Sequence, residues 1–231
     1  MNKNNPVKGL VKYSLYSASG HIIMSGGIVL GLGILMTAFG STPTFPIFAI
    51  TILVPASLAS NAQDDKSNWT RFQLTMPVKR KDVILSKYVT YLIFLLMALV
   101  ISGVFIGLAR VLHEMNIVEY GTALFGSIEQ LVEGFDPRAV THRLLLVAIG
   151  GALIVCSLYY PLAYTLFKGK EEGLSLITLF FSVAIMALIG WLGFKFELSL
   201  NSIIALNVVV PVILFVVSYV ITTKIYAKID V

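Results

Sequence analysis

The sequence predicts an all-α, polytopic membrane protein with six transmembrane helices and with both termini in the cytosol. The first two observations are compositional: 57% of the 231 residues are hydrophobic and only 13% are charged. A soluble domain has about 25% charged residues. The third is a mean hydropathy of +0.88. We therefore expect residues 1–231 to form a single membrane domain.

Six apolar segments have about the length of a spanning helix, which is roughly 20 residues. They cover residues 21–39, 45–60, 88–112, 143–167, 174–194 and 202–223. No cleavage site of small residues follows the first segment, so we interpret it as a retained helix and not as a signal peptide. The second segment is the shortest and contains Pro46 and Pro55, so its ends are the hardest to place.

Basic residues are concentrated on one side of these spans. With the N-terminus in the cytosol, thirteen of the seventeen Lys and Arg residues lie inside, and only Arg110, Arg138, Arg143 and Lys195 lie outside. The positive-inside rule predicts this asymmetry for short loops. It also explains the net charge of +5, so we expect no nucleic-acid partner.

Residues 1–20 have the pattern of a helix that lies in the inner membrane interface. Lys8 and Lys12 share a face that would meet anionic lipid headgroups, and Tyr13 and Tyr16 suit the headgroup region. Apolar residues recur at helical spacing on another face, at Val7, Leu10, Val11 and Leu15.

The outer loop, residues 113–141, is acidic and is expected to contain an amphipathic helix that ends at Pro137. Its apolar stripe consists of Leu124, Phe125, Ile128, Leu131 and Val132. Such a helix either gates an exit or shields the ends of the spans, and the sequence favours neither.

Small residues inside the spans predict close helix packing, either within one subunit or between two. They form two GxxxG pairs and one adjacent pair, at Gly27 and Gly31, Gly103 and Gly107, and Gly150 and Gly151. Prolines at 55, 161 and 211 are expected to kink their helices.

The spans lack the ionisable groups that ion-coupled transporters need deep in the bilayer. The few polar candidates for a translocation path are Thr178, Ser182, Asn207 and Ser218. Such a path is mostly apolar and suits a lipid-like or amphipathic cargo better than an ion or a sugar, although helix packing explains the same residues.

No pattern for ATP hydrolysis, catalysis or metal binding is found in the sequence. The run KGKEEG, which includes Glu171 and Glu172, lacks the spacing of a phosphate-binding loop. The histidines His21, His113 and His142 form no HExxH pair, although the last two flank one loop. The single cysteine, Cys156, lies in an apolar run and is interpreted as a packing residue. We expect no enzyme activity, cofactor or metal in this chain.

The polar stretch of residues 61–87 interrupts the apolar segments and holds six of the basic residues. It combines an acidic pair with apolar anchors and a basic cluster, at Asp64, Asp65, Trp69, Phe72, Leu74, Met76, Pro77, Lys79, Arg80 and Lys81. Buried aromatic and Met side chains with flanking charges are typical of a docking surface. The alternative is a loop that rests on anionic lipid through its lysines.

The string DDKSNWTRFQLTMPVKRKDVILSKY resembles the signature of ABC-2 type permease subunits. In that signature an acidic start and an aromatic residue precede a segment "lPv.R..iv.sKy". The matching positions are Asp64, Trp69, Pro77, Val78, Arg80, Val83, Ser86, Lys87 and Tyr88. The chain is similar in particular to the permeases of phenol-soluble modulin and antimicrobial peptide exporters.

The resemblance implies that this stretch is a coupling helix that docks on separate ABC ATPase subunits, which bind ATP and Mg. The implied contact residues are Asp64, Asp65, Trp69, Arg71, Phe72, Met76, Pro77, Lys79, Arg80 and Lys81. It also implies a second permease subunit, identical or homologous, in the plasma membrane. One departure is that the loop near residues 195–201 is short, where many relatives have re-entrant outer helices.

The sequence therefore predicts a permease subunit of an ATP-driven exporter of amphipathic peptides or other hydrophobic cargo. Two other classes stay open. One is a non-transporting membrane anchor or sensor that recruits a cytosolic partner, and the other is an ion-coupled secondary transporter.

Overall fold

The computed structural model describes residues 6–39, 42–66, 69–75, 78–117, 137–166 and 171–228, and within them the regular secondary structure is helical, with no strand. The first group of helices is α1 (Pro6–Ser17), α2 (Ser19–Ala38), α3 (Phe45–Lys66) and α5 (Arg80–Glu114). A 3-10 turn, η1 (Thr42–Thr44), precedes α3, and the short α4 (Trp69–Thr75) follows it. The second group is α7 (Pro137–Thr165), α8 (Glu171–Lys195) and α9 (Leu200–Ala227).

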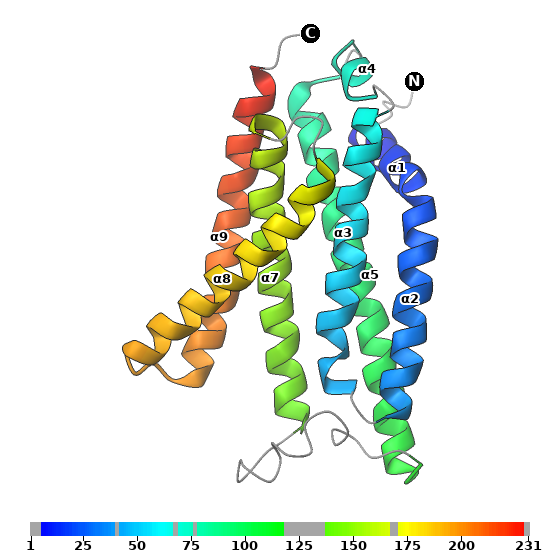
Figure 1. Ribbon diagram of the computed structural model, residues 1–231, viewed down its shortest axis with the longest axis vertical. Helices are drawn as coiled ribbons and strands as arrows, with labels where there is room; N and C mark the ends of the chain where they lie inside the picture. The colour runs from blue at the N-terminus through cyan, green and yellow to red at the C-terminus, as the bar shows by residue number, and fades with distance from the viewer. Residues whose placement is uncertain are drawn as a thin grey trace.

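The helices form an elongated bundle with two neighbouring groups. Figure 1 shows α2, α3 and α5 side by side, while α7 packs along α9 and α8 runs obliquely across them. Contacts of α3 with α7 and of α5 with α9 join the two groups. The start of α1, the short α4 and the end of α9 lie at the same end of the bundle.

Among the described residues, five helices are long and apolar enough to cross a membrane. They are Ser19–Ala38, Arg80–Glu114, Thr141–Thr165, Gly173–Lys195 and Leu200–Ala227. Five of the six expected spans therefore coincide with such helices. The other one coincides with Thr42–Leu58, which is apolar but shorter; α3 itself continues to Lys66.

The polar stretch is more helical than a loop between spans would be. α3 continues to Lys66, and α5 begins at Arg80 instead of residue 88, with Asp82 in its first turn. A carboxylate at that position favours the helix because it faces the positive end of the helix dipole. One basic residue of the stretch, Lys87, lies inside the bundle and is only 4% exposed.

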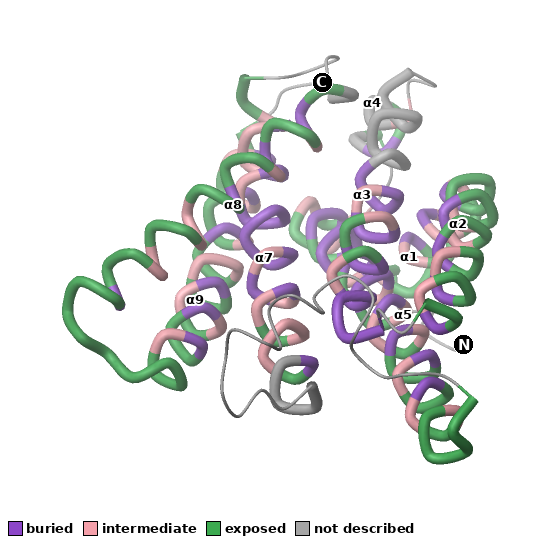
Figure 2. The backbone as a smooth tube through the Cα atoms, turned by 60° about the horizontal axis from the view of Figure 1, so that its bottom comes forward, coloured by how far each residue is buried: buried purple, intermediate pink, exposed green. Residues whose placement is uncertain are grey.

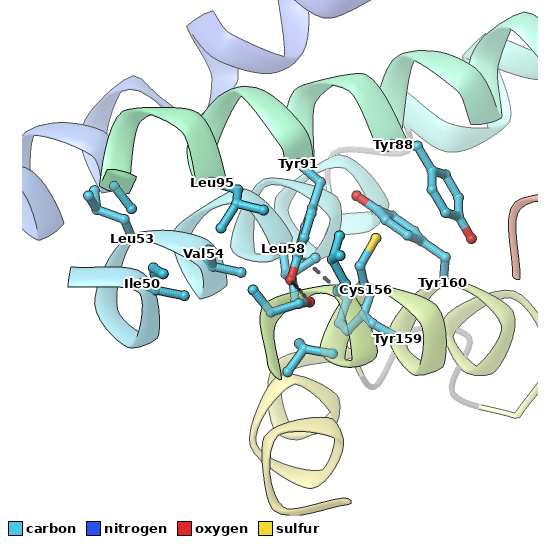
Figure 3. Packing of buried hydrophobic residues seen from close by; sticks show 14 of the residues in the cluster. Ile50, Leu53, Val54, Leu58, Tyr88, Tyr91, Leu95, Cys156, Tyr159 and Tyr160 are labelled. Carbon is cyan, nitrogen blue, oxygen red and sulfur yellow. Dashed lines mark hydrogen bonds between the residues drawn. The ribbon is translucent and has the colours of Figure 1, made fainter. Parts of the chain in front are cut away.

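The core lies where α3, α5 and α7 meet, and it is rich in tyrosine. Figure 3 shows Tyr91 of α5 directed at α7, where its hydroxyl donates to the carbonyl oxygen of Ala152. Cys156 is buried beside it. On α7, the hydroxyl of Tyr159 donates to the carbonyl oxygen of Leu58 on α3 at 3.3 Å. Each buried phenol thus satisfies a backbone carbonyl of another helix.

Close contacts between helices occur at Gly33 and Gly150. Of these two glycines, only Gly150 was predicted from the sequence. A Cβ on Gly33 of α2 would stand 2.5 Å from the ring of Phe105 on α5. A Cβ on Gly150 of α7 would overlap the carbonyl oxygen of Asn207 on α9. By contrast, a Cβ on any glycine of the two GxxxG pairs, Gly27 and Gly31 and Gly103 and Gly107, meets nothing within 4 Å among the described residues. Within the described part of the chain, these pairs therefore make no close helix contact.

The outer faces of the bundle are apolar. Large hydrophobic side chains of α2, α5, α8 and α9 are exposed, and Figure 2 shows long exposed stretches on α2 and α8. They include Ile23, Met24, Ile34, Leu96, Val104, Phe180, Phe181, Leu188, Val209 and Val216. Apolar exposure on this scale is expected of helices that face lipid, since water would penalise it.

Candidate functional site

The centre of the predicted docking stretch is the short helix α4, which is held against α1. The ring of Trp69 stacks on Tyr13 of α1, with 4.1 Å between the ring centroids and 26° between the planes. Phe72 lies next to Trp69 at 5.2 Å and is 54% exposed. Trp69 therefore anchors α4 on α1, whereas Phe72 presents an apolar ring to the surroundings.

The anchor of α4 includes an unsatisfied donor. The indole Nε1 of Trp69 is buried, and among the described residues it has no hydrogen-bond partner. A buried donor without a partner costs about 1–3 kcal/mol. Ring stacking gives back about 0.5–1.5 kcal/mol beyond the area it buries. The stack therefore offsets part of the cost of the unpaired indole N–H.

Arg80, at the start of α5, binds the end of the last helix. Its Nη1 donates to the carbonyl oxygens of Ala227 at 2.9 Å and Tyr226 at 3.3 Å. The last carbonyls of a helix have no partner inside the helix, and a cation there also complements the helix dipole. Arg80 therefore caps α9 and ties it to the first turn of α5.

Further along α5, at Tyr88, a network of hydrogen bonds also connects this helix to α9. The Oγ of Ser218 on α9 donates to the carbonyl oxygen of Ser157 on α7 at 2.7 Å. The hydroxyl of Tyr88 lies 2.8 Å from Ser218 Oγ and 3.0 Å from Thr222 Oγ1. Because the proton of Ser218 is directed at Ser157, Tyr88 donates to Ser218 and accepts from Thr222. The network joins α5, α7 and α9.

The buried Lys87 adjoins this network through its backbone. Its carbonyl oxygen accepts a hydrogen bond from the hydroxyl of Tyr160 at 3.2 Å. Tyr160 in turn packs on Tyr88, with 4.7 Å between the ring centroids. The consecutive residues Lys87 and Tyr88 thus lie inside the bundle and contact α7 and α9.

The structure separates the predicted contact residues into groups. Trp69 and Phe72 lie together on α4. Lys79 and Lys81 are exposed beside the partly buried Arg80. The side chains of Asp64, Asp65 and Arg71 lie outside the description, as do Met76 and Pro77 altogether.

The sequence named Tyr13 and Ser218 but did not predict which residues they contact. Tyr13 was assigned to lipid headgroups, but it also stacks on Trp69. Ser218 was named as a polar residue within a span, and its hydrogen bonds to Ser157 and Tyr88 show what it does there. The available signal for the contact of Tyr13 with Trp69 was that Tyr13 is an aromatic residue on the partly buried side of α1.

The polar residues proposed for a translocation path are buried and bonded within the bundle. Thr178 donates to the carbonyl of Leu174, and Ser182 donates to the carbonyl of Leu179. The side-chain amide of Asn207 donates to the carbonyl of Ile203. All three hydrogen bonds stay within one helix, and the buried Oδ1 of Asn207 has no partner among the described residues.

The other candidates form no site in the described structure. His113 is in the last turn of α5 and His142 is near the start of α7. Among the described residues, no three His, Cys, Asp or Glu side chains gather as metal ligands. Most of the acidic outer loop, and the side chains of Glu171 and Glu172, lie outside the described residues.

The comparison with protein families decides the class. The model of the family described as "ABC-2 family transporter protein" matches residues 9–128, which is more than half of the chain. The chain belongs to the ABC-2 transporter family. It is therefore a multi-pass membrane permease of an ABC transporter, and this family works with ABC ATPase partners. Searches of curated proteins and of solved structures gave no match.

The matched region of this ABC-2 permease includes α1 to α5, and hence both the Tyr13–Trp69 stack and Arg80. The short connection after α8 agrees with the departure expected from the sequence. α8 ends at Lys195 and α9 begins at Leu200.

Proposed function

We propose that this ABC-2 permease is one of two permease subunits of a plasma-membrane exporter for amphipathic peptides, and that α4 docks on the ATPase partner. ATP and Mg are bound and used in that partner, and this chain has no enzyme activity of its own. The observation that supports the docking site best is Phe72, a half-exposed aromatic ring on a helix that Trp69 anchors to α1.

In this proposal the chain crosses the membrane six times, with α3 as the second span and both termini inside. The start of α1, the short α4 and the end of α9 lie at one end of the bundle, as this topology requires. At the other end, the Nζ of Lys195 lies 5.3 Å from the ring centroid of Trp191. Trp and Lys side chains concentrate at membrane–water interfaces, so this pair supports a boundary there.

The docked ATPase would move more than α4. Arg80 follows α4 after a few residues and is bonded to the end of α9, and Tyr88 is bonded to Ser218 and Thr222 of the same helix. A displacement of the docking region would therefore reach α9 as well as α5. In this proposal, closure of the ATPase pair tilts these helices and opens the path outward.

The cargo is proposed from the composition of the bundle and from the resemblance to phenol-soluble modulin and antimicrobial peptide exporters. The polar side chains within the spans are bonded inside the bundle, and the exposed faces are apolar. A path between two such subunits would suit a peptide with a large apolar face and would give little to a sugar or an ion.

Co-purification with an ABC ATPase partner tests the docking site. We expect the Phe72→Ala variant to lose the partner and to lose stimulated ATP hydrolysis, while Trp69→Ala weakens both by releasing α4 from α1. The matched control is Phe194→Ala, which removes an 82% exposed ring at the other end of the bundle. Equal loss in both Phe variants would contradict the docking site.

Transport assays in proteoliposomes separate the proposal from its alternatives. Peptide export that requires ATP supports the exporter. Transport driven by a proton gradient without ATP would instead make the chain a secondary transporter. A stable complex with a cytosolic partner but no transport would make it an anchor or sensor.

A further inference from the structure

An apolar slot lies between α3, α7 and α8 and opens at the surface of the bundle, where its lining residue Val183 is 61% exposed. Its volume is about 340 Å³, which is at the small end of the range for ligand pockets, roughly 300–1,000 Å³. Its walls are Ile47 to Pro55 of α3, Val147 to Val155 of α7 and Ser175 to Ala187 of α8. In Figure 1, α8, which forms one wall, runs obliquely across the bundle.

The slot is long and narrow. Eight residue steps along α3 or along α7 correspond to about 12 Å of helix, at a rise of about 1.5 Å per residue. Spread over that length, the volume of about 340 Å³ leaves about 6 Å for the centres of water-sized atoms, which is about 9 Å from wall to wall once an atomic radius of about 1.4 Å is added on each side. A helical peptide with its side chains is about 10–12 Å wide and does not fit. A single hydrocarbon chain does.

The lining excludes a polar occupant. Its polar side chains are three hydroxyl groups, those of Thr51, Ser175 and Ser182, and all its other lining residues are apolar. The hydroxyl of Ser182 already donates to the carbonyl of Leu179 at 2.8 Å. A stable water molecule needs about two to four polar partners, and a charged group needs a counter-charge that the lining does not offer.

We propose that this slot binds one acyl chain of a membrane lipid. The slot lies along the central part of α7, which runs from Pro137 to Thr165, and at that depth the surrounding medium is lipid hydrocarbon. Transfer of a chain from the bilayer into the slot gains little hydrophobic free energy, because both are apolar. The gain comes from dispersion contacts that an empty slot would lack. The inference rests on the membrane location of the chain and not on the proposed cargo.

Photo-crosslinking in nanodiscs tests the site. The probe is a phosphatidylcholine with a diazirine on one acyl chain, and the labelled residues are mapped by mass spectrometry of the full-length permease. We expect labels on lining residues of α7 and α8. The substitution Ala187→Leu should reduce these labels several-fold, since it places a larger side chain in the slot.

The matched control is Ala184→Leu, an exposed alanine of the same helix that does not line the slot. Thermal unfolding of both variants checks that each is folded, and Ala148→Leu fills the slot from α7 if Ala187→Leu does not fold. Equal labelling of the slot in the control and in the slot-filling variant would overturn the proposal. Labelling by a diazirine-bearing amphipathic peptide with none by the lipid would overturn it too, in favour of a peptide site.

Discussion

The backbone carbonyl oxygen of Asn207 on α9 lies against Gly150 on α7, where a Cβ would overlap it. Pro211 explains why this oxygen is available. A proline has no N–H, so the carbonyl four residues earlier in α9 loses its helical donor. Pro211 also lines the same contact, with its Cγ 3.5 Å from the position of a Cβ on Gly150. The closest approach of the two helices therefore depends on one glycine and one proline.

We expect Gly150→Ala to destabilise the permease by about 1–3 kcal/mol, the usual cost of overpacking a close contact. The obstacle is backbone and cannot rotate away. The control is Gly27→Ala, where a Cβ meets nothing within 4 Å and where alanine gains helix propensity of up to about 1 kcal/mol. Thermal unfolding in nanodiscs measures both. Similar melting temperatures for the two variants would contradict the contact.

We expect Tyr88→Phe to destabilise the permease by about 1 kcal/mol. The variant keeps the ring but loses the hydroxyl that joins Ser218 and Thr222 of α9. Hydrogen bonds between membrane helices are worth about 0.6 kcal/mol on average and at most about 1.7. Unfolding with increasing concentrations of a denaturing detergent measures the change in the free energy of unfolding. Tyr16→Phe, at an 80% exposed position of α1, should have no effect, and a loss of equal size there would refute the assignment.

Much of the fold could be predicted because a bilayer makes hydrophobicity a direct signal. Five of the expected spans coincide with helices that can cross a membrane. The amphipathic pattern of residues 6–17 is present in α1, where Leu10 is buried and Lys8 and Lys12 are exposed. These features depend on one helix and its solvent, so a single sequence contains them.

What could not be predicted depends on which helices meet. A GxxxG pair promotes packing only if another backbone lies opposite. Gly27 and Gly31 have no such neighbour among the described residues, whereas the isolated Gly33 has the ring of Phe105. Likewise, no pattern in the sequence indicates that Lys87 is buried, with its backbone carbonyl oxygen accepting from the hydroxyl of Tyr160 on α7. The stack of Tyr13 on Trp69 joins two segments that are far apart in the sequence.

We expect Arg80→Gln to loosen the last turn of α9. The variant removes the cation that donates to the carbonyls of Tyr226 and Ala227. A cation at a helix C-terminus contributes about 0.3–1 kcal/mol, so amide hydrogen exchange near the end of α9 should accelerate about two- to fivefold. The exchange rate of the Arg80→Lys variant should lie between those of the unmodified permease and Arg80→Gln. Lysine keeps the charge but loses the planar group that reaches two carbonyls. Lys81→Gln, at an exposed neighbour, should leave the exchange unchanged.

We expect Cys156 to be a reporter of core opening, because it is the single cysteine of the chain and is fully buried between α5 and α7. A maleimide can reach its sulfur only when the core opens, and an opening free energy of about 3 kcal/mol would slow labelling more than a hundredfold. Tyr91→Ala removes the ring that packs beside it and the hydroxyl bonded to Ala152, so labelling of this variant should approach the rate in the unfolded chain. Mass spectrometry after timed exposure in nanodiscs measures the rate, with Tyr16→Ala as the control at an exposed tyrosine. Rapid labelling of the unmodified permease would show that α5 and α7 do not enclose the thiol, and would remove the basis for the tyrosine-rich core that joins the docking region to the second group of helices.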